Sequence, residues 1–208
     1  MASGSVAVYH LKGFRHQRTR SKKMNLEELR HECENCQKCG LGATRTNLVF
    51  GVGNENADLM FVGEAPGEKE DLSGEPFVGA AGKLFNKYLE AVDIKREEVY
   101  IANILKCRPP KNRDPMPDEQ EKCIGFLREQ FKIIQPAIVV CLGRIAACKL
   151  IKPDFKVTKE HGVFFDKKGT LFVGTFHPAA LLRDPRKKED ALNDFLKIRE
   201  KAEELNLV

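Results

Sequence analysis

The chain has 208 residues, of which 42% are hydrophobic, so it is long enough to bury one substantial core and we expect one compact domain. No apolar run reaches the length of a membrane-spanning helix, and the size and patterning argue against a small, disulfide-held secreted scaffold. The formal net charge of +5 is no guide to partners. Residues 1–23 contain six basic side chains and no acidic one, and the remainder balances 29 Lys and Arg against 30 Asp and Glu.

Residues 1–23 have no helical or strand periodicity and lack the long apolar core of a signal peptide. We expect them to form a disordered N-terminal extension, followed by a single domain over residues 24–208. We also expect a soluble, cytoplasmic monomer without membrane contact.

From residue 24 onwards, apolar strands alternate with amphipathic helices. Strands are expected at residues 57–62, 98–105, 137–142 and 171–176. Helices are expected at residues 24–38, 80–93, 118–134, 143–151 and 188–205, with an extended piece at 46–50 and a hairpin-like region at 155–169. This alternation predicts an α/β fold in three layers, α/β/α, with a central, mainly parallel four-stranded sheet and right-handed crossovers.

A glycine-rich, acidic loop over residues 61–82 follows the first of these strands. It carries Glu64, Glu68, Glu70 and Asp71 before an isolated aromatic, Phe77. Ligands often bind at the carboxyl ends of parallel strands, because backbone N–H groups and helix N-termini converge there. The loop therefore indicates a pocket for a flat, polar ligand.

Two later strands also lead into polar side chains. Asn103 lies inside an apolar strand and must satisfy both an amide donor and a carbonyl acceptor, either with the edge of a base or with the backbone. His177 follows the strand at 171–176. A lone histidine is more often structural, but a shared edge of the sheet favours a role in one site. Leu181 and Leu182, beside a cation, are suited to wedging into a duplex or packing on a neighbouring helix.

Seven cysteines favour thiolate chemistry over disulfides. Cys141 and Cys148 lie on apolar faces, where buried thiols are common. The other five are Cys33, Cys36 and Cys39, spaced C-x2-C-x2-C, together with Cys107 at a strand end and Cys123 on a helix. Four thiolates suit zinc or a [4Fe–4S] cluster, and the spacing decides neither the metal nor which of Cys33 and Cys39 is left over. The alternative is that all five are reduced thiols without a metal.

Several motifs, taken in order, resemble one family from about Cys36 to the final helix. They are the C-x2-C before TRTNLVFG, then GEAPGEKED, EPFVGAAG, the strand containing Asn103 followed by KCRPPKNRDPMP, a cysteine fifteen residues after Cys107, VVCLG and HPAALLR. Together they look like a family 4 uracil-DNA glycosylase, the iron–sulfur branch of that superfamily.

This resemblance implies an enzyme of base excision repair, which flips uracil out of single- or double-stranded DNA and hydrolyses its N-glycosidic bond to leave an abasic site. The implied uracil contacts are Gly63, Glu64, Ala65, Phe77, Asn103 and His177, with Phe77 stacking on the ring and His177 near O2. The implied ligands of a [4Fe–4S] cluster are Cys36, Cys39, Cys107 and Cys123. The implied DNA contacts are Arg108, Lys111, Asn112, Arg113, Leu181, Leu182 and Arg183, and Lys106 is expected to face phosphates with its neighbours.

The first motif departs from related families in one position. Those families have Asp or Asn, tied to water activation, where this chain has Ala65. We therefore expect a water held near Glu64 and Ala65, helped by Glu70 or Asp71. His177 and backbone N–H groups at residues 63–67 would then stabilise the uracil anion.

Two other classes of protein stay open. One is a non-catalytic DNA-binding module with a thiolate metal site, which would bind uracil-containing strands without an abasic product. The other is a zinc or iron–sulfur redox protein, for which the chain has no flavin or nicotinamide fingerprint. A sliding clamp is left open as a partner.

Overall fold

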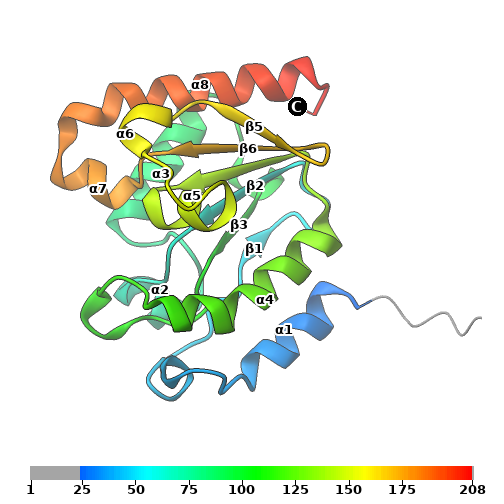
Figure 1. Cartoon of the computed structure of the whole chain (residues 1–208), viewed down its shortest axis with the longest axis vertical. Helices are drawn as coiled ribbons and strands as arrows, with labels where there is room; N and C mark the ends of the chain where they lie inside the picture. Colours follow the sequence, from blue (N-terminus) through cyan, green and yellow to red (C-terminus); the bar gives the residue numbers. More distant parts are fainter. Residues whose placement is uncertain (1–23, 208) are drawn as a thin grey trace, which may run out of the picture.

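The computed structural model describes residues 24–207, so the predicted N-terminal extension lies outside the described residues. At its centre is one sheet with the strand order β1-β3-β2-β4-β6-β5 (Figure 1). The strands are β1 (Val52–Gly53), β2 (Leu59–Gly63), β3 (Tyr100–Asn103), β4 (Ile138–Leu142), β5 (Phe164–Lys167) and β6 (Thr170–Thr175).

The expectation of four strands is corrected to six among the described residues. The four predicted strands form the parallel centre, β3, β2, β4 and β6. Each edge of the sheet adds one antiparallel strand, β1 against β3 and β5 against β6. A strand of two residues such as β1 is too short to show an alternating pattern, and β5 comes from the hairpin-like region.

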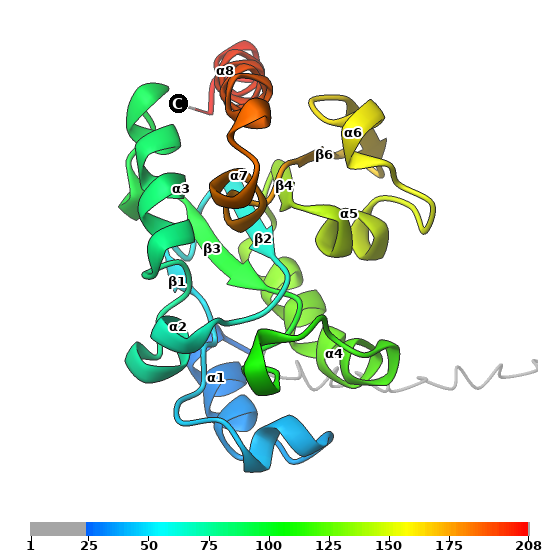
Figure 2. The same ribbon diagram turned by 90° about the vertical axis from the view of Figure 1, so that its left-hand side faces the viewer.

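Helices cover both faces of the sheet, so the predicted three layers are confirmed (Figure 2). One core packs the sheet against α1, α4 and α5, and a second core packs it against α3, α7 and α8. The helices are α1 (Leu26–Glu34), α2 (Glu68–Ser73), α3 (Ala80–Ala91), α4 (Pro117–Ile134), α5 (Arg144–Leu150), α6 (Val157–Glu160), α7 (Pro178–Arg183) and α8 (Lys188–Glu204). None of these described helices is long and apolar enough to cross a membrane.

Local sequence signals set the ends of the helices. At the start of α1, the Asn25 side chain accepts the Glu28 N–H at 2.8 Å, and the Glu28 carboxylate accepts the Asn25 N–H at 3.1 Å. Helix α4 begins with Pro117 and ends at Ile134, and the next residue, Gln135, takes the left-handed conformation (φ 54°) before Pro136. The short helices α2 and α7 lie inside loops that the sequence pattern leaves without structure.

The parallel strands all end at one edge of the sheet, and their register brings distant residues together. Gly63 at the end of β2 pairs with Asn103 at the end of β3. On the other side of β2, the Gly143 N–H after β4 donates to the carbonyl of Thr175 at the end of β6, at 2.8 Å. The three polar stretches predicted from the sequence therefore share this edge.

Candidate active site

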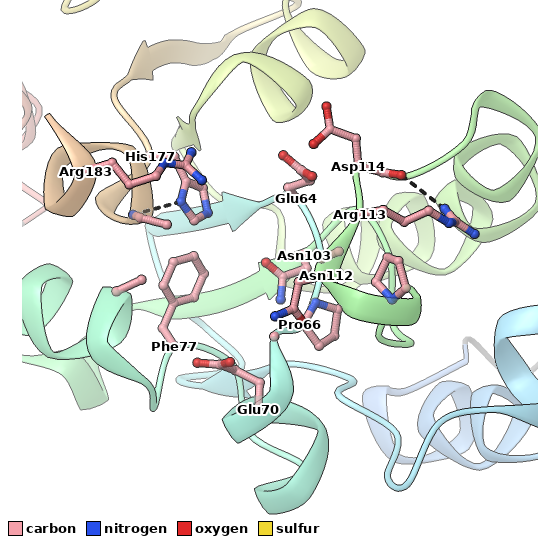
Figure 3. A pocket seen from close by; sticks show the side chains of 15 residues that line it. Glu64, Pro66, Glu70, Phe77, Asn103, Asn112, Arg113, Asp114, His177 and Arg183 are labelled. Atoms are coloured by element: carbon pink, nitrogen blue, oxygen red, sulfur yellow. Dashed lines mark hydrogen bonds between the residues drawn. The ribbon is translucent and has the colours of Figure 1, made fainter.

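A pocket of about 350 Å³ opens at the carboxyl edge of the sheet (Figure 3). Its walls are the loop after β2, the first turn of α3, the loop after β3 and the start of α7. Nine residues of the predicted site line it, namely Glu64, Ala65, Glu70, Phe77, Asn103, Asn112, Arg113, His177 and Arg183. Residues up to 119 positions apart in the sequence thus meet in one cavity.

Phe77 forms an aromatic wall of the pocket and is held in an unusual backbone conformation. Its φ of 55° lies in the left-handed region, which is costly for a bulky residue. The side chain is only 6% exposed, and its ring centroid lies 5.8 Å from that of His177. A Cβ at Gly63 would come within 2.6 Å of the Phe77 ring, so the glycine allows the ring to lie directly over the end of β2.

Asn103 presents an unpaired polar atom to the pocket. The residue is 2% exposed, yet its Oδ1 has no hydrogen-bond partner and is the one such buried side-chain atom among residues 24–207. A buried acceptor without a donor costs free energy, and an unpaired group of this kind indicates a missing partner. A ligand with an N–H donor would satisfy it.

His177 points into the pocket from the N-cap of α7. Its Nδ1 accepts the Ala179 N–H at 3.1 Å, so the ring proton of the neutral form is on Nε2. Burial and, to a smaller extent, the charge of the nearby Arg183 together lower the pKa of His177 to about 4. The imidazole is therefore a neutral hydrogen-bond donor at physiological pH.

Glu64 lies between His177 and Asp114 in the pocket (Figure 3). Burial raises the pKa of its carboxyl to about 7 and the negative charge of Asp114 raises it too, while Arg144 and Arg183 oppose the rise. A carboxylate with this pKa exchanges a proton readily near neutral pH, as a general base must.

The structure separates the two acids that were expected to assist Glu64. Glu70 lines the pocket, and its Oε1 accepts the N–H groups of Val78 at 3.0 Å and Gly79 at 2.8 Å, which fixes the loop that carries Phe77. Asp71 lies outside the pocket lining, is 3% exposed and accepts the Thr46 N–H. This placement corrects the expectation that Asp71 assists a water.

The residues expected to contact DNA divide in the same way. Leu182 is 45% exposed, but Leu181 is 1% exposed and packs in the core against α3 and α8, so its expected wedging role is wrong. Lys106 is also buried and cannot face phosphates: its Nζ donates to the Asn103 carbonyl at 3.0 Å and to Gln130 Oε1 at 2.6 Å. Lys111 is exposed and lies outside the pocket lining.

Salt bridges occupy two of the predicted arginines. Arg113 forms a two-bond pair with Glu119, at 2.9 and 2.6 Å. Arg108 pairs with Glu68 at 3.9 Å and also donates a hydrogen bond to Asn112 at 2.8 Å. Sequence reasoning missed Asp114 and Arg144, which pair at 3.5 Å and both act on Glu64. The position of Arg144 just after β4 was an available signal, whereas Asp114 lies far along the loop after β3 and gave none.

The five cysteines other than Cys141 and Cys148 line one small cavity between α1, the residue 36–45 segment and the loop after β3. Two donors already face their sulfurs: Arg45 Nη1 lies 3.2 Å from the Cys107 Sγ, and the Lys106 N–H lies 3.4 Å from the Cys123 Sγ. Within residues 24–207, no three His, Cys, Asp or Glu side chains come close enough together to hold a single metal ion. Four thiolates around one cavity are the donor set that a [4Fe–4S] cluster takes.

Comparison with known proteins identifies relatives of this chain. A family model described as the uracil DNA glycosylase superfamily matches residues 50–200. The type-4 uracil-DNA glycosylase of Archaeoglobus fulgidus is 47% identical over 184 residues, which are 85% of this chain and 92% of that protein. Those of Sulfurisphaera tokodaii (43% over 187 residues; 86% and 85%) and Thermotoga maritima (44% over 161 residues; 76% and 84%) are also similar.

The α/β sheet with its base-sized pocket is thus the fold of a DNA glycosylase, and the chain belongs to the uracil-DNA glycosylase superfamily. Within it, the chain groups with the proteins named type-4 uracil-DNA glycosylases, so the resemblance drawn from the motifs is confirmed.

Proposed function

We propose that this protein excises uracil from DNA by hydrolysing the bond between the base and its deoxyribose. The observation that supports this most directly is the unpaired Oδ1 of Asn103 in the pocket. Uracil presents an N3–H donor beside an O4 acceptor, which an amide satisfies with its own acceptor and donor. Cytosine reverses both groups, so it would leave the buried amide unsatisfied.

An extruded base would stack on Phe77. The base must leave the duplex to reach this pocket, which costs roughly a few kcal/mol and least for mispaired or single-stranded uracil. Stacking on an aromatic ring offsets part of that cost. The left-handed backbone of Phe77, fixed by Glu70, holds the ring in place before the base arrives.

Bond cleavage leaves an anionic uracil and a cationic sugar, so the main requirement is to stabilise separated charge. The neutral His177 would donate its Nε2–H to O2 of the departing base. One such donor in a water-poor site contributes about 3 kcal/mol to the transition state, a factor of more than a hundred in rate. Backbone N–H groups at residues 63–67 would add to this.

Glu64 is our candidate for the base that activates the attacking water. Ala65 has no titratable side chain, and the carboxylate of Glu70 already accepts two backbone N–H groups. Glu64 alone combines a place in the pocket with a pKa raised to about 7. Its proton would come from the water as the oxygen attacks C1′ of the sugar.

Arg183 and Leu182 are the residues of α7 best placed to contact the DNA around the pocket. Arg183 lines the pocket beside His177, and Leu182 is exposed next to it. Arginine binds phosphates and sets position and salt dependence, while an apolar side chain can fill the space that the base leaves in the stack. Asn112 and Arg113 line the opposite wall.

We further propose that Cys36, Cys39, Cys107 and Cys123 hold a [4Fe–4S] cluster, with Cys33 as the spare thiol. The common cavity of these thiols and the N–H groups that face Cys107 and Cys123 support this. When bound, the cluster supplies a rigid link between α4, the N-terminal cysteines and the loop after β3. Lys106, buried between this cavity and the Asn103 carbonyl, ties that loop to the base pocket.

Incubation with an oligonucleotide containing one uracil, followed by alkali, tests the function. The wild type should cleave the strand at uracil and leave cytosine- and thymine-containing strands intact. His177→Ala and Asn103→Ala should each reduce cleavage by about a hundredfold or more while keeping the brown colour of the cluster. His31→Ala, which changes an exposed histidine on α1, serves as the matched control. A wild type that binds the oligonucleotide without making abasic sites would instead support the non-catalytic module.

The monomeric state, the cytoplasmic location and contact with a sliding clamp stay predictions.

A further inference from the structure

A buried carboxylate on α8, Asp194, lies behind the pocket and takes no part in the chemistry above. It is 0% exposed and interrupts the apolar stripe that α8 packs against the sheet, otherwise formed by Ala191, Phe195, Ile198 and Ala202. A carboxylate inside an apolar core is costly unless it is hydrogen-bonded, so its partners indicate its role.

Asp194 accepts hydrogen bonds from two separate segments of the chain. The hydroxyl of Thr175 donates to its Oδ2 at 2.6 Å, the short distance typical of a bond to a carboxylate. The Nδ1 of His161 lies 2.9 Å from Oδ1 and 3.0 Å from Oδ2. Gly162 lets the loop approach so closely: its φ is +68°, and a Cβ there would lie 2.3 Å from Oδ1.

These contacts lead directly to the histidine of the pocket. Thr175 is the last residue of β6, and His177 follows two positions later. The Thr175 carbonyl accepts the Gly143 N–H at 2.8 Å, and a Cβ on Gly143 would lie 2.7 Å from the Cβ of His177. The intervening Phe176 packs its ring on His161, with centroids 4.8 Å apart.

Each residue of the segment 175–177 therefore contacts a residue of another part of the chain. Asp194 fixes the first, the His161 ring fixes the second, and Gly143 lies against the third. The helix α8 supplies none of the residues that line the pocket. Its influence on the pocket passes through these contacts.

We propose that Asp194 is a positioning residue for uracil excision, which anchors Thr175 and His161 so that the Nε2–H of His177 faces the extruded base. The inference rests on the proposed role of His177. A displacement of about 1 Å in a reacting group costs about a hundredfold in rate, so a lost anchor should slow excision without weakening DNA binding equally.

The test measures the single-turnover rate of uracil excision and the Kd for uracil-containing DNA. Asp194→Ala should lower the rate by about 30- to 100-fold and change the Kd by less than about threefold. Thr175→Val removes only the hydroxyl and should also slow excision, whereas Thr175→Ser keeps it and should be at least about tenfold faster than Thr175→Val. Because both side chains act through one bond, the double variant should lose less than the product of the two single losses.

Ile198→Ala is the matched control, because Ile198 is equally buried one turn further along α8 and its side chain cannot form a hydrogen bond with Thr175. It should lower the melting temperature and leave the rate of the folded enzyme within about twofold. A folded Asp194→Ala with the wild-type rate, or one no slower than Ile198→Ala, would overturn the inference. If Asp194→Ala does not fold, equal rates for Thr175→Val and Thr175→Ser would overturn it instead. If His177→Ala keeps the wild-type rate, His177 does not have its proposed role. That result is distinguishable from a failure of the inference about Asp194.

Discussion

The replacement of Glu64 by Gln tests most directly how the water is activated. Glutamine keeps the size of the side chain and its ability to accept a hydrogen bond, but it cannot take up a proton near neutral pH. In the wild type, burial and Asp114 raise the pKa of this carboxyl to about 7. Only the ionised form can accept the proton of the water, so the excision rate should rise with pH and level off above that value.

The size of the effect follows from the ionised fraction. With a pKa of about 7, the carboxylate is ionised in about one molecule in thirty at pH 5.5 and in about nine in ten at pH 8. If the base contributes about a hundredfold, the low end of the usual range, Glu64→Gln should be about a hundredfold slower at pH 8 and only about fourfold slower at pH 5.5. Single-turnover excision from single-stranded DNA, measured between pH 5.5 and 8.5, gives both profiles.

A wild-type rate that does not change over this pH range would refute the reasoning, and so would a Glu64→Gln enzyme that keeps the wild-type profile. Stability provides an independent check of the same pKa. Because the folded pKa lies above the ordinary value of 4.5, Glu64 contributes stability that is full below about 4.5 and is lost as the pH rises through about 7. The melting temperature of Glu64→Gln, measured over the same pH range, should therefore not show this decrease with rising pH.

Three further predictions concern the surroundings of the pocket. Gly143→Ala should lower the single-turnover rate of excision by at least about tenfold, because the φ of Gly143 is +90° and the new Cβ would press on His177. A wild-type rate would contradict this contact. Cys39→Ser should lose iron and colour on purification, whereas Cys33→Ser should keep both, and the reverse result would exchange the two as ligands. Leu182→Ala should slow excision from double-stranded DNA by roughly fivefold or more and from single-stranded DNA much less, because the side chain is needed only where a stack must be filled; equal losses would argue against a wedge.

The buried Lys106 shows how the cysteine cavity and the pocket are connected. A lysine in the interior loses its hydration, and burial lowers its pKa to about 8. Its ammonium group is held by the Asn103 carbonyl and by Gln130, which in turn donates to Tyr100 and to the backbone of Phe50. The same side chain lines the cysteine cavity, so the position of the strand that carries Asn103 depends on the packing of the cysteine segment.

The amino-acid sequence was sufficient to predict the parallel centre of the sheet, the helices α1, α3, α4, α5 and α8, and most of the residues that line the pocket. Apolar strands covered on both faces read as continuous hydrophobic runs, and their polar ends are therefore conspicuous. Glu64, Asn103 and His177 each interrupt or follow such a run, which is why they could be chosen before any coordinates. The edge strand β1 has too few residues for a pattern and was missed, and β5 was expected only as part of a hairpin-like region.

The sequence pattern did not show which polar side chains face the pocket, because this depends on how each local turn packs in the folded chain. Asp71 and Glu70 are neighbours in the sequence, but the turn of α2 directs one toward the Thr46 backbone and the other toward the pocket. Leu181 and Leu182 separate in the same way, because adjacent residues of a helix point about 100° apart and α7 packs one side on the core. The role of Asp194 could not be predicted from the sequence, because the residue lies in an apolar stripe of α8. Its role rests on long-range contacts with Thr175 and His161, and the spacing of residues along the chain does not encode such contacts.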